Sequence, residues 1–457
     1  NLKCHLGKHL NIFTQNKKTI ICNTFVLFFL AFLVRFIYLV LQSPSPEKLI
    51  EDELLYWNAS NIYLDKGFLE ESIAAERMFG IFIYIKVLLI ISLKNLTIYL
   101  VLQSILDSIN CFIIYKIANL IFPKQKLFIY LSAVLSPLMI ILSSQVLSET
   151  IFLFFFTLFL YFSVKIILEK NKLFYKIAIA GLFLGLSTSI RSITYPLVYL
   201  SVLPFIIILI QKNVSKYKIF FSSLIFIFFS LLPISSRLYE NIKFHNTFSL
   251  TSQTGTHLAY WVAPLIISET KNINRNEAIK VVAEIANKYT FTDDYYKNDK
   301  ILRQIGFEVL SEINKVDMVF HWIKGGLVNL VAPSILLDKN LRSLPHPSFY
   351  ETGSIFLWLK LIFSNSEYYK YLTFLTIACL SCIFTITSLV VGPAFIYKNN
   401  RMIFYLTTLY VLYFLTITGP VLSPKYIFPI LPCIFLYQGI TIFKLVQFLT
   451  KGKFEKL

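Results

Sequence analysis

The stretch TIFLFFFTLFLYFSVKIIL, residues 150–168, decides the fold class of this chain. Its length matches the roughly 20 residues that an α-helix needs to cross a bilayer, and Lys165 is its only charge. Similar runs recur throughout the 457 residues, of which 56% are hydrophobic and 15% charged, with a mean hydropathy of +0.67. The sequence therefore predicts an all-α polytopic membrane protein. It excludes a soluble multidomain enzyme, a disordered chain and, because there are only 6 cysteines, a disulfide scaffold.

Ten such runs are expected to span the membrane. The run 80–93 is not counted, because roughly 14 residues with Lys86 among them are more typical of an interfacial helix than of a span. The expected spans cover residues 19–41, 98–121, 127–146, 150–168, 175–190, 193–211, 219–236, 371–396, 402–419 and 427–448.

The formal net charge of +18 does not indicate a nucleic-acid partner. The positions of the basic residues instead indicate how the chain is oriented in the membrane. Basic residues gather in short connections between spans, not in a basic stripe with interleaved aromatic residues. An N-terminus on the cytoplasmic side, beside Lys17 and Lys18, places all the short basic connections in the cytoplasm. These connections carry Lys124/Lys126, Lys170/Lys172, Lys212/Lys216/Lys218, Lys398/Arg401 and Lys451/Lys453/Lys456.

This orientation divides the chain into three parts. Helical periodicity is expected at Asn276–Lys288 and Ile301–Asn314, and the apolar run at 355–363 is too short to span. The parts are a seven-span catalytic module, 1–236, with a large external loop at 42–97, then an external α-helical domain, 237–369, and three closing transmembrane helices, 370–457.

Acidic residues stand out at two places on the predicted external side. Asp52 lies between two glutamates just after the first span, and Glu149 lies at the outer end of the third span between apolar segments. Solvated loop charges would also explain the first group. A carboxylate at a membrane boundary needs a partner or a purpose, so Asp52 and Glu149 are candidate catalytic residues that we expect to lie close together.

Four basic residues lie on the side that the positive-inside rule disfavours: Arg77, Arg191, Arg237 and Lys425. An anionic ligand would explain this, because Arg and Lys recognise phosphate. Each could instead anchor a helix end at the interface, and Arg237 could pair with Glu240 one turn along. We expect the other three to line one anion site.

Polar residues also occur within the predicted spans. Gln103, Asp107 and Asn110 share one face of the second span, where they either form interhelical hydrogen bonds or line a substrate path. Arg35, in the first span, either snorkels to the external surface or has a structural role.

Several short motifs occur in a fixed order at the predicted external ends of spans. They are Asp52-Glu53-x-x-Tyr56-x-x-Ala59, Glu76-Arg77, Ser136-Pro137 leading to Leu147-Ser148-Glu149, Gly181-x-x-x-Gly185 running into Ile190-Arg191, and Pro424-Lys425-Tyr426-x-x-Pro429-x-x-Pro432. In this order the chain resembles the protein mannosyltransferase and aminoarabinose transferase group of GT-C glycosyltransferases. Leu55, Met78-Phe79 and Lys425 depart from that group's pattern, which leaves the sugar open.

The resemblance implies a GT-C-like bundle and assigns roles to the matched residues. Asp52 matches the catalytic carboxylate, Glu149 the second acid of the active-site rim, and Arg77 a donor-phosphate contact. The only cofactor considered is a divalent metal ion. Its candidate ligands are Glu76, which the resemblance implies, and His257, which lies at the start of the external domain. The remaining expected substrate-binding residues are Glu53, Tyr56, Arg191, Arg237, Lys425 and Tyr426.

The expected reaction moves a sugar from a polyprenyl-phosphate donor to a hydroxyl on a protein, lipid or glycan. The phosphate is already a good leaving group, so cations and one carboxylate base suffice, and direct displacement would invert the anomeric centre. The Lys- and Ile-rich usage suggests a bacterial cytoplasmic membrane, with the active site facing outward and membrane lipids around the bundle. A transporter or flippase of lipid-linked sugars is the alternative, and a purely structural membrane subunit leaves Asp52 and Glu149 unexplained.

Overall fold

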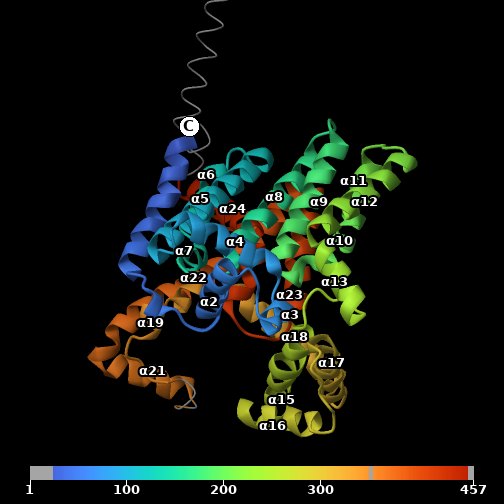
Figure 1. The fold of residues 1–457 in the computed structure, drawn as a ribbon. Helices are drawn as coiled ribbons and strands as arrows, with labels where there is room; N and C mark the ends of the chain where they lie inside the picture. The colour runs from blue at the N-terminus through green and yellow to red at the C-terminus, as the bar shows by residue number, and fades with distance from the viewer. Residues whose placement is uncertain (1–23, 349–351, 353, 451–457) are drawn as a thin grey trace, which may run out of the picture.

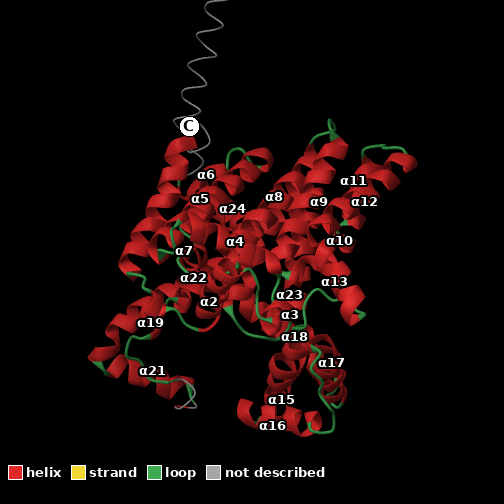
Figure 2. Cartoon of the chain, viewed as in Figure 1, coloured by secondary structure: helices red, strands yellow, loops and turns green. Residues whose placement is uncertain are grey.

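The computed structural model describes residues 24–348, 352 and 354–450 of the chain, and within these ranges the regular structure is helical throughout, with no strand (Figure 2). Nine of the described helices are long and apolar enough to cross a membrane, and a pair bent by 47° would make a tenth. All ten predicted runs coincide with these helices. The start of the first run, Lys17, Lys18 and the C-terminal lysines from Lys451 onward lie outside the described residues.

The spanning helices have the following bounds. They are Thr24–Gln42, α5 (Leu96–Ile121), the bent pair α6 (Lys126–Val134) and α7 (Pro137–Ser143), α8 (Glu149–Leu168), α9 (Leu173–Ile190), η2 to α11 (Ser192–Gln211), α12 to α13 (Lys216–His245), η6 and α22 (Ser366–Asn399), α23 (Arg401–Thr418), and η7 with α24 (Pro424–Leu449).

The shorter elements gather beyond one end of this bundle, which we call the α2 face (Figure 1). The other end, which we call the basic face, carries the lysine-rich connections α8–α9 and α11–α12. Elements of the α2 face are η1 (Pro46–Lys48), α2 (Glu51–Lys66), α3 (Glu71–Glu76), α4 (Phe79–Ile91), α14 (Thr254–Thr256), the π-helical turn η4 (His257–Val262), α15 (Ala263–Lys271), α16 (Arg275–Ala286), α17 (Tyr295–Ser311), α18 (Lys315–Val331), η5 (Ser334–Leu337), α19 (Lys339–Arg342) and α21 (Ile355–Ser364).

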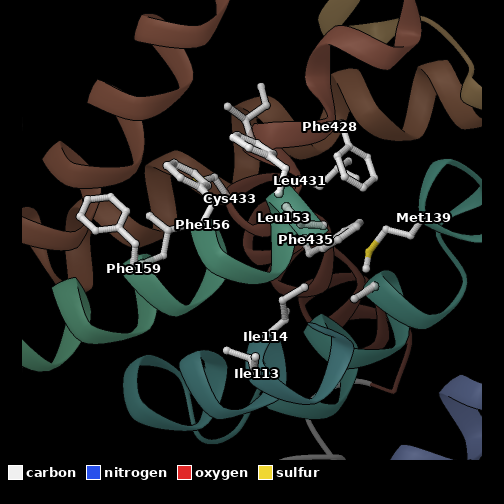
Figure 3. Close-up of a cluster of buried hydrophobic side chains, with 14 of the residues drawn as sticks. Ile113, Ile114, Met139, Leu153, Phe156, Phe159, Phe428, Leu431, Cys433 and Phe435 are labelled. Atoms are coloured by element: carbon white, nitrogen blue, oxygen red, sulfur yellow. The ribbon is translucent and has the colours of Figure 1, made fainter. Parts of the chain in front are cut away.

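Apolar side chains of α5, α7, α8, η7 and α24, four of the labelled ones phenylalanines, pack together inside the bundle (Figure 3). Phe156 of α8 stands edge-on to Phe414 and Tyr410 of α23, with ring centroids 5.4 and 6.0 Å apart, and all three rings are buried. Edge-to-face aromatic pairs add about 0.5–1.5 kcal/mol each beyond the area that they bury. The phenylalanine-rich run that predicts a span therefore also supplies the core.

Small residues allow two spans to approach closely. A Cβ on Gly181 would lie 2.6 Å from the carbonyl oxygen of Phe226, and one on Gly185 only 2.3 Å from that of Ser230. Glycines four residues apart on a helix are a common device for close packing in membranes. The Gly181-x-x-x-Gly185 motif thus holds α9 against α12.

The helix formed by the predicted run 80–93, α4, has 13 residues and is too short to be a candidate span. It packs against α2, α5 and α9, and its Ile81, Phe82 and Ile85 are buried. Lys86 lies over the ring of Tyr63 in α2, with 4.2 Å between its ammonium nitrogen and the ring centroid. The run therefore completes the packing of α2 and adds no further crossing to the ten.

Arg35 does not snorkel outward, contrary to one of the two expectations. It is fully buried, and its Nε donates to Asp107 Oδ2 at 2.6 Å. Its Nη atoms also donate to the carbonyl oxygens of Ala133 and Val134, at 3.5 and 3.4 Å, just before the bend between α6 and α7. A buried charge requires such a partner, so the role of Arg35 is structural.

The predicted polar stripe of α5 forms interhelical hydrogen bonds. Gln103 donates to the carbonyl oxygens of Ser143 and Gln145, at 3.0 and 2.6 Å, and Asn110 donates to that of Thr150 at 3.3 Å. The three side chains of the stripe, including Asp107, are fully buried. They join α5 to α7 and to the start of α8, and so support the segment that ends at Glu149.

The polar segment that follows the seventh span has a small core of its own, formed by η4 and α15 to α17. The helices predicted at Asn276–Lys288 and Ile301–Asn314 correspond to α16 and α17. The expected boundary at residue 237 falls inside α13, because the helix continues past the apolar residues to His245. α21, at the predicted interfacial run, has 10 residues and is not a candidate span.

Candidate functional site

Five charged side chains alternate in sign along one line at the α2 face. Arg77 Nη2 lies 3.1 Å from Asp52 Oδ1, and Arg191 Nη1 lies 2.7 Å from Glu149 Oε1. Lys425 Nζ lies between the two acids, 3.8 Å from Asp52 Oδ2 and 3.7 Å from Glu149 Oε1. We call these residues the charge row; they bring together the two predicted acids and three predicted cations.

The charged residues of the row lie at or beside the ends of helices, and the helix dipole stabilises the charges of Asp52, Glu149 and Arg191. Asp52 lies in the first turn of α2 and Glu149 is the first residue of α8, where the positive end of a helix dipole stabilises a carboxylate. Arg191 directly follows the last residue of α9, where the negative end stabilises a cation. Lys425 lies in η7, whose start is capped by Ser423. Arg77 directly follows α3, so five separate elements converge on one site.

The charge row faces solvent unevenly. The side chain of Asp52 is 39% exposed and that of Lys425 31%, whereas that of Glu149 is 2% exposed. Arg77 Nε is buried and has no hydrogen-bond partner among the described residues. The row carries three cations and two carboxylates, so it has one positive charge in excess when all five groups are ionised. It is suited to an anionic ligand that reaches Asp52 from the solvent side.

Aromatic rings lie beneath the two arginines. The Arg77 guanidinium lies 5.9 Å from the ring centroid of Tyr56, and that of Arg191 lies 5.9 Å from Phe152. Burial raises the pKa of Tyr56, although the charge of Arg77 opposes this. Tyr56 is therefore a neutral hydroxyl at neutral pH, and the rings hold both guanidinium planes in place.

Glu53 belongs to a second cluster beside the charge row. Its carboxylate, which is 6% exposed, pairs with Lys339 of α19. The preceding residue, Asp338, accepts hydrogen bonds from Tyr38 and from Gln42 Nε2, the latter at 2.9 Å. Burial raises the pKa of Glu53, and the Lys339 ammonium opposes this. The polar segment is thus fastened to α2 next to Asp52 by Lys339 and to the first spanning helix by Asp338, two residues that the sequence analysis did not identify.

Arg237 lies outside the charge row, and no ion pair with Glu240 is found among the described residues. Its guanidinium donates to the carbonyl oxygens of Ala74, in α3, and of Leu250, the latter at 3.2 Å. It therefore braces α13 against α3. Tyr426, next to Lys425 in η7, is partly buried and packs against the small core of the polar segment.

The predicted metal ligands do not form a cluster. Within the described residues no group of three or more His, Cys, Asp or Glu side chains could hold a metal ion. Burial lowers the pKa of His257, which keeps its imidazole neutral. Glu76 ends α3, directly before Arg77. The chemistry proposed below is therefore derived from the charge row alone.

An apolar crevice of about 470 Å³ lies between α6, α7, α22 and α24. Ile427, two residues after Lys425, lines it, as do Leu131 and Leu135, whose side chains are 38% and 62% exposed on the flank of the bundle. A crevice of this kind can hold part of an apolar chain that enters from the lipid.

No protein-family model matches this chain. A comparison with curated proteins likewise gave no match.

Proposed function

We propose that this protein is a membrane glycosyltransferase that moves a sugar from a polyprenyl-phosphate donor to an acceptor hydroxyl. The observation that carries the proposal is the charge row, in which three cations and two carboxylates from separate elements meet at one membrane boundary. A structural ion pair needs two partners, whereas an alternating row of five, part of it open to solvent, is suited to a phosphate beside a base.

The proposed step is a direct displacement. The acceptor oxygen attacks the anomeric carbon while the bond from that carbon to the phosphate oxygen breaks, and the phosphate leaves with the bonding electrons. Asp52, the more exposed of the two acids, takes the hydroxyl proton, and Arg77, Arg191 and Lys425 stabilise the charge that develops on the phosphate. Attack opposite the leaving group inverts the anomeric centre.

The donor tail would lie in the apolar crevice beside η7. Ile427 links the crevice to the loop that bears Lys425, and Leu131 and Leu135 open it toward lipid. A long apolar tail can then remain in the bilayer while its phosphate meets the charge row at headgroup depth. This arrangement avoids passing the tail through a polar channel.

The proposed setting is a bacterial cytoplasmic membrane with the α2 face outward. The lysine-rich connections α8–α9 and α11–α12 lie on the opposite, basic face, and the positive-inside rule assigns such a face to the cytoplasm. The acceptor, whether protein, lipid or glycan, would then arrive from outside the cell.

The test compares Asp52→Asn and Glu149→Gln with unchanged protein, in proteoliposomes that contain polyprenyl-phosphate sugars and a cell-envelope extract as acceptor. We expect each substitution to abolish sugar transfer, while Asp65→Asn, an exposed acid of α2 that pairs with Lys94 at 2.7 Å, retains it. Transfer that survives in both site variants would refute the proposal. Movement of intact lipid-linked sugar across the bilayer without transfer would indicate a flippase instead.

A further inference from the structure

The helix α18 has a row of exposed apolar side chains that no described element covers. Val316, Phe320, Ile323 and Leu327 follow one another at helical spacing and are 73%, 61%, 57% and 57% exposed. Val319, beside this row, is 52% exposed. A water-exposed helix does not ordinarily present a contiguous apolar surface of this kind.

The other faces of α18 are occupied. On one side, Lys324 Nζ lies 2.6 Å from Glu269 Oε2 of α15, and His321 lies 3.8 Å from the same oxygen. On another side, α18 packs closely against the segment that directly follows α23. A Cβ on Gly325 would lie only 2.5 Å from Pro420. Among the described residues, no element packs over the apolar row.

Contacts with α23 place α18 beside the last turn of a candidate spanning helix. Trp322 Nε1 donates to the carbonyl oxygen of Thr416 at 2.8 Å, and Gly326 faces Leu415. Leu415 and Thr416 belong to the last turn of α23, on which Leu412 and Ile417 are 57% and 38% exposed as apolar side chains. The exposed row of α18 therefore lies on a helix that packs against the end of a candidate span whose own apolar side chains are exposed.

We propose that the apolar row of α18 is a lipid-binding surface, embedded among the acyl chains of the leaflet at the α2 face. Lipid is favoured over a second copy of this chain because the helix that bears the row packs against the end of α23, whose exposed apolar side chains a bilayer must cover. Asn329 of α18 donates to the carbonyl oxygen of Val421 and accepts from the backbone N–H of Ser423, both at 2.7 Å. The embedded helix thus holds the loop just ahead of Lys425 at a set depth.

A photocrosslinking experiment tests this without reference to any reaction. The full chain carries p-benzoylphenylalanine in place of Phe320 and, in a matched control, in place of Phe307 of α17, which is equally exposed at 61%. A third variant carries it in place of Ile323, in case the first does not fold. Each is reconstituted into vesicles of phosphatidylethanolamine and phosphatidylglycerol with radiolabelled acyl chains and irradiated.

We expect several-fold more lipid label at position 320 or 323 than at position 307. A crosslinked dimer in place of the lipid adduct would show that a second copy covers the row, and the proposal would fall. The absence of a lipid adduct at both α18 positions would indicate a water-facing helix and would also refute the proposal. Equally strong labelling at position 307 would refute it as well.

Discussion

Lys425 is the residue on which the candidate site depends most, because its ammonium separates Asp52 from Glu149. We predict that Lys425→Met lowers kcat/KM for the lipid-phosphate donor by about 100-fold, the usual cost of removing one group that stabilises developing charge. Lys444→Met, on the same helix but bonded to Gln447, is the matched control and should keep full activity. Steady-state kinetics at varied donor concentration measures both, and unchanged donor use by Lys425→Met would contradict the assignment.

The buried pair of Arg35 and Asp107 leads to a prediction about stability. We expect Asp107→Leu to destabilise the protein by about 3–5 kcal/mol, because it leaves an uncompensated buried charge. The double variant Arg35→Leu, Asp107→Leu should recover most of this loss, since neither charge then remains. Thermal unfolding in detergent, analysed as a double-mutant cycle, measures the coupling. Losses that simply add would show that the pair is not coupled.

The sequence predicts individual members of the charge row because charged residues are unusual at these positions next to predicted spans. Asp52 and Glu149 are acids next to predicted spans, and Arg191 and Lys425 lie on the predicted external side, where cations are disfavoured, so each is conspicuous within an apolar surrounding. Lys339 is not conspicuous. It lies in a segment of mixed charge, 286 residues from its partner Glu53, and no local pattern predicts a pairing over such a distance.

Among the elements, the packing of α9 against α12 determines where Arg191 lies. We predict that Gly185→Leu separates these helices, since even a Cβ at this position would lie 2.3 Å from a backbone oxygen. The displaced end of α9 should then lower sugar transfer as well as melting temperature. Ala178→Leu, on a partly exposed side of the same helix, should change neither. Normal activity in Gly185→Leu would mean that the site does not depend on this contact.

Hydropathy predicts the end of a helix only where the sequence changes from apolar to polar at that same position. All ten apolar runs correspond to candidate spans, because burial in lipid requires both the apolar composition and the helix. The end of α13 is not predicted, since the helix continues for 11 residues of polar sequence. Similarly, hydropathy does not predict the bend of 47° next to Pro137, because both halves of the run are apolar.

For the whole molecule, the orientation in the membrane is the prediction to test first. We expect a cysteine at Glu70, on the α2 face, to react with a membrane-impermeant maleimide in intact cells. A cysteine at Lys170, in the α8–α9 connection, should react only after the cells are permeabilised, because the positive-inside rule assigns the basic connections to the cytoplasm. Labelling by mass shift on a gel distinguishes the two. The reverse pattern would place the charge row inside the cell and remove an external acceptor from the proposed function.

The length of the helix from α12 to α13 has a mechanical consequence. Its apolar part ends near residue 236, and the rest of α13, to His245, extends roughly 13 Å further at the α-helical rise per residue. Arg237 braces this extension against Ala74 and Leu250. In the proposed membrane setting it would act as a rigid spacer that sets the clearance between the polar segment and the headgroups. In the proposed reaction, a thin or flexible acceptor would fit that clearance, whereas a bulky folded one would have to offer a protruding strand.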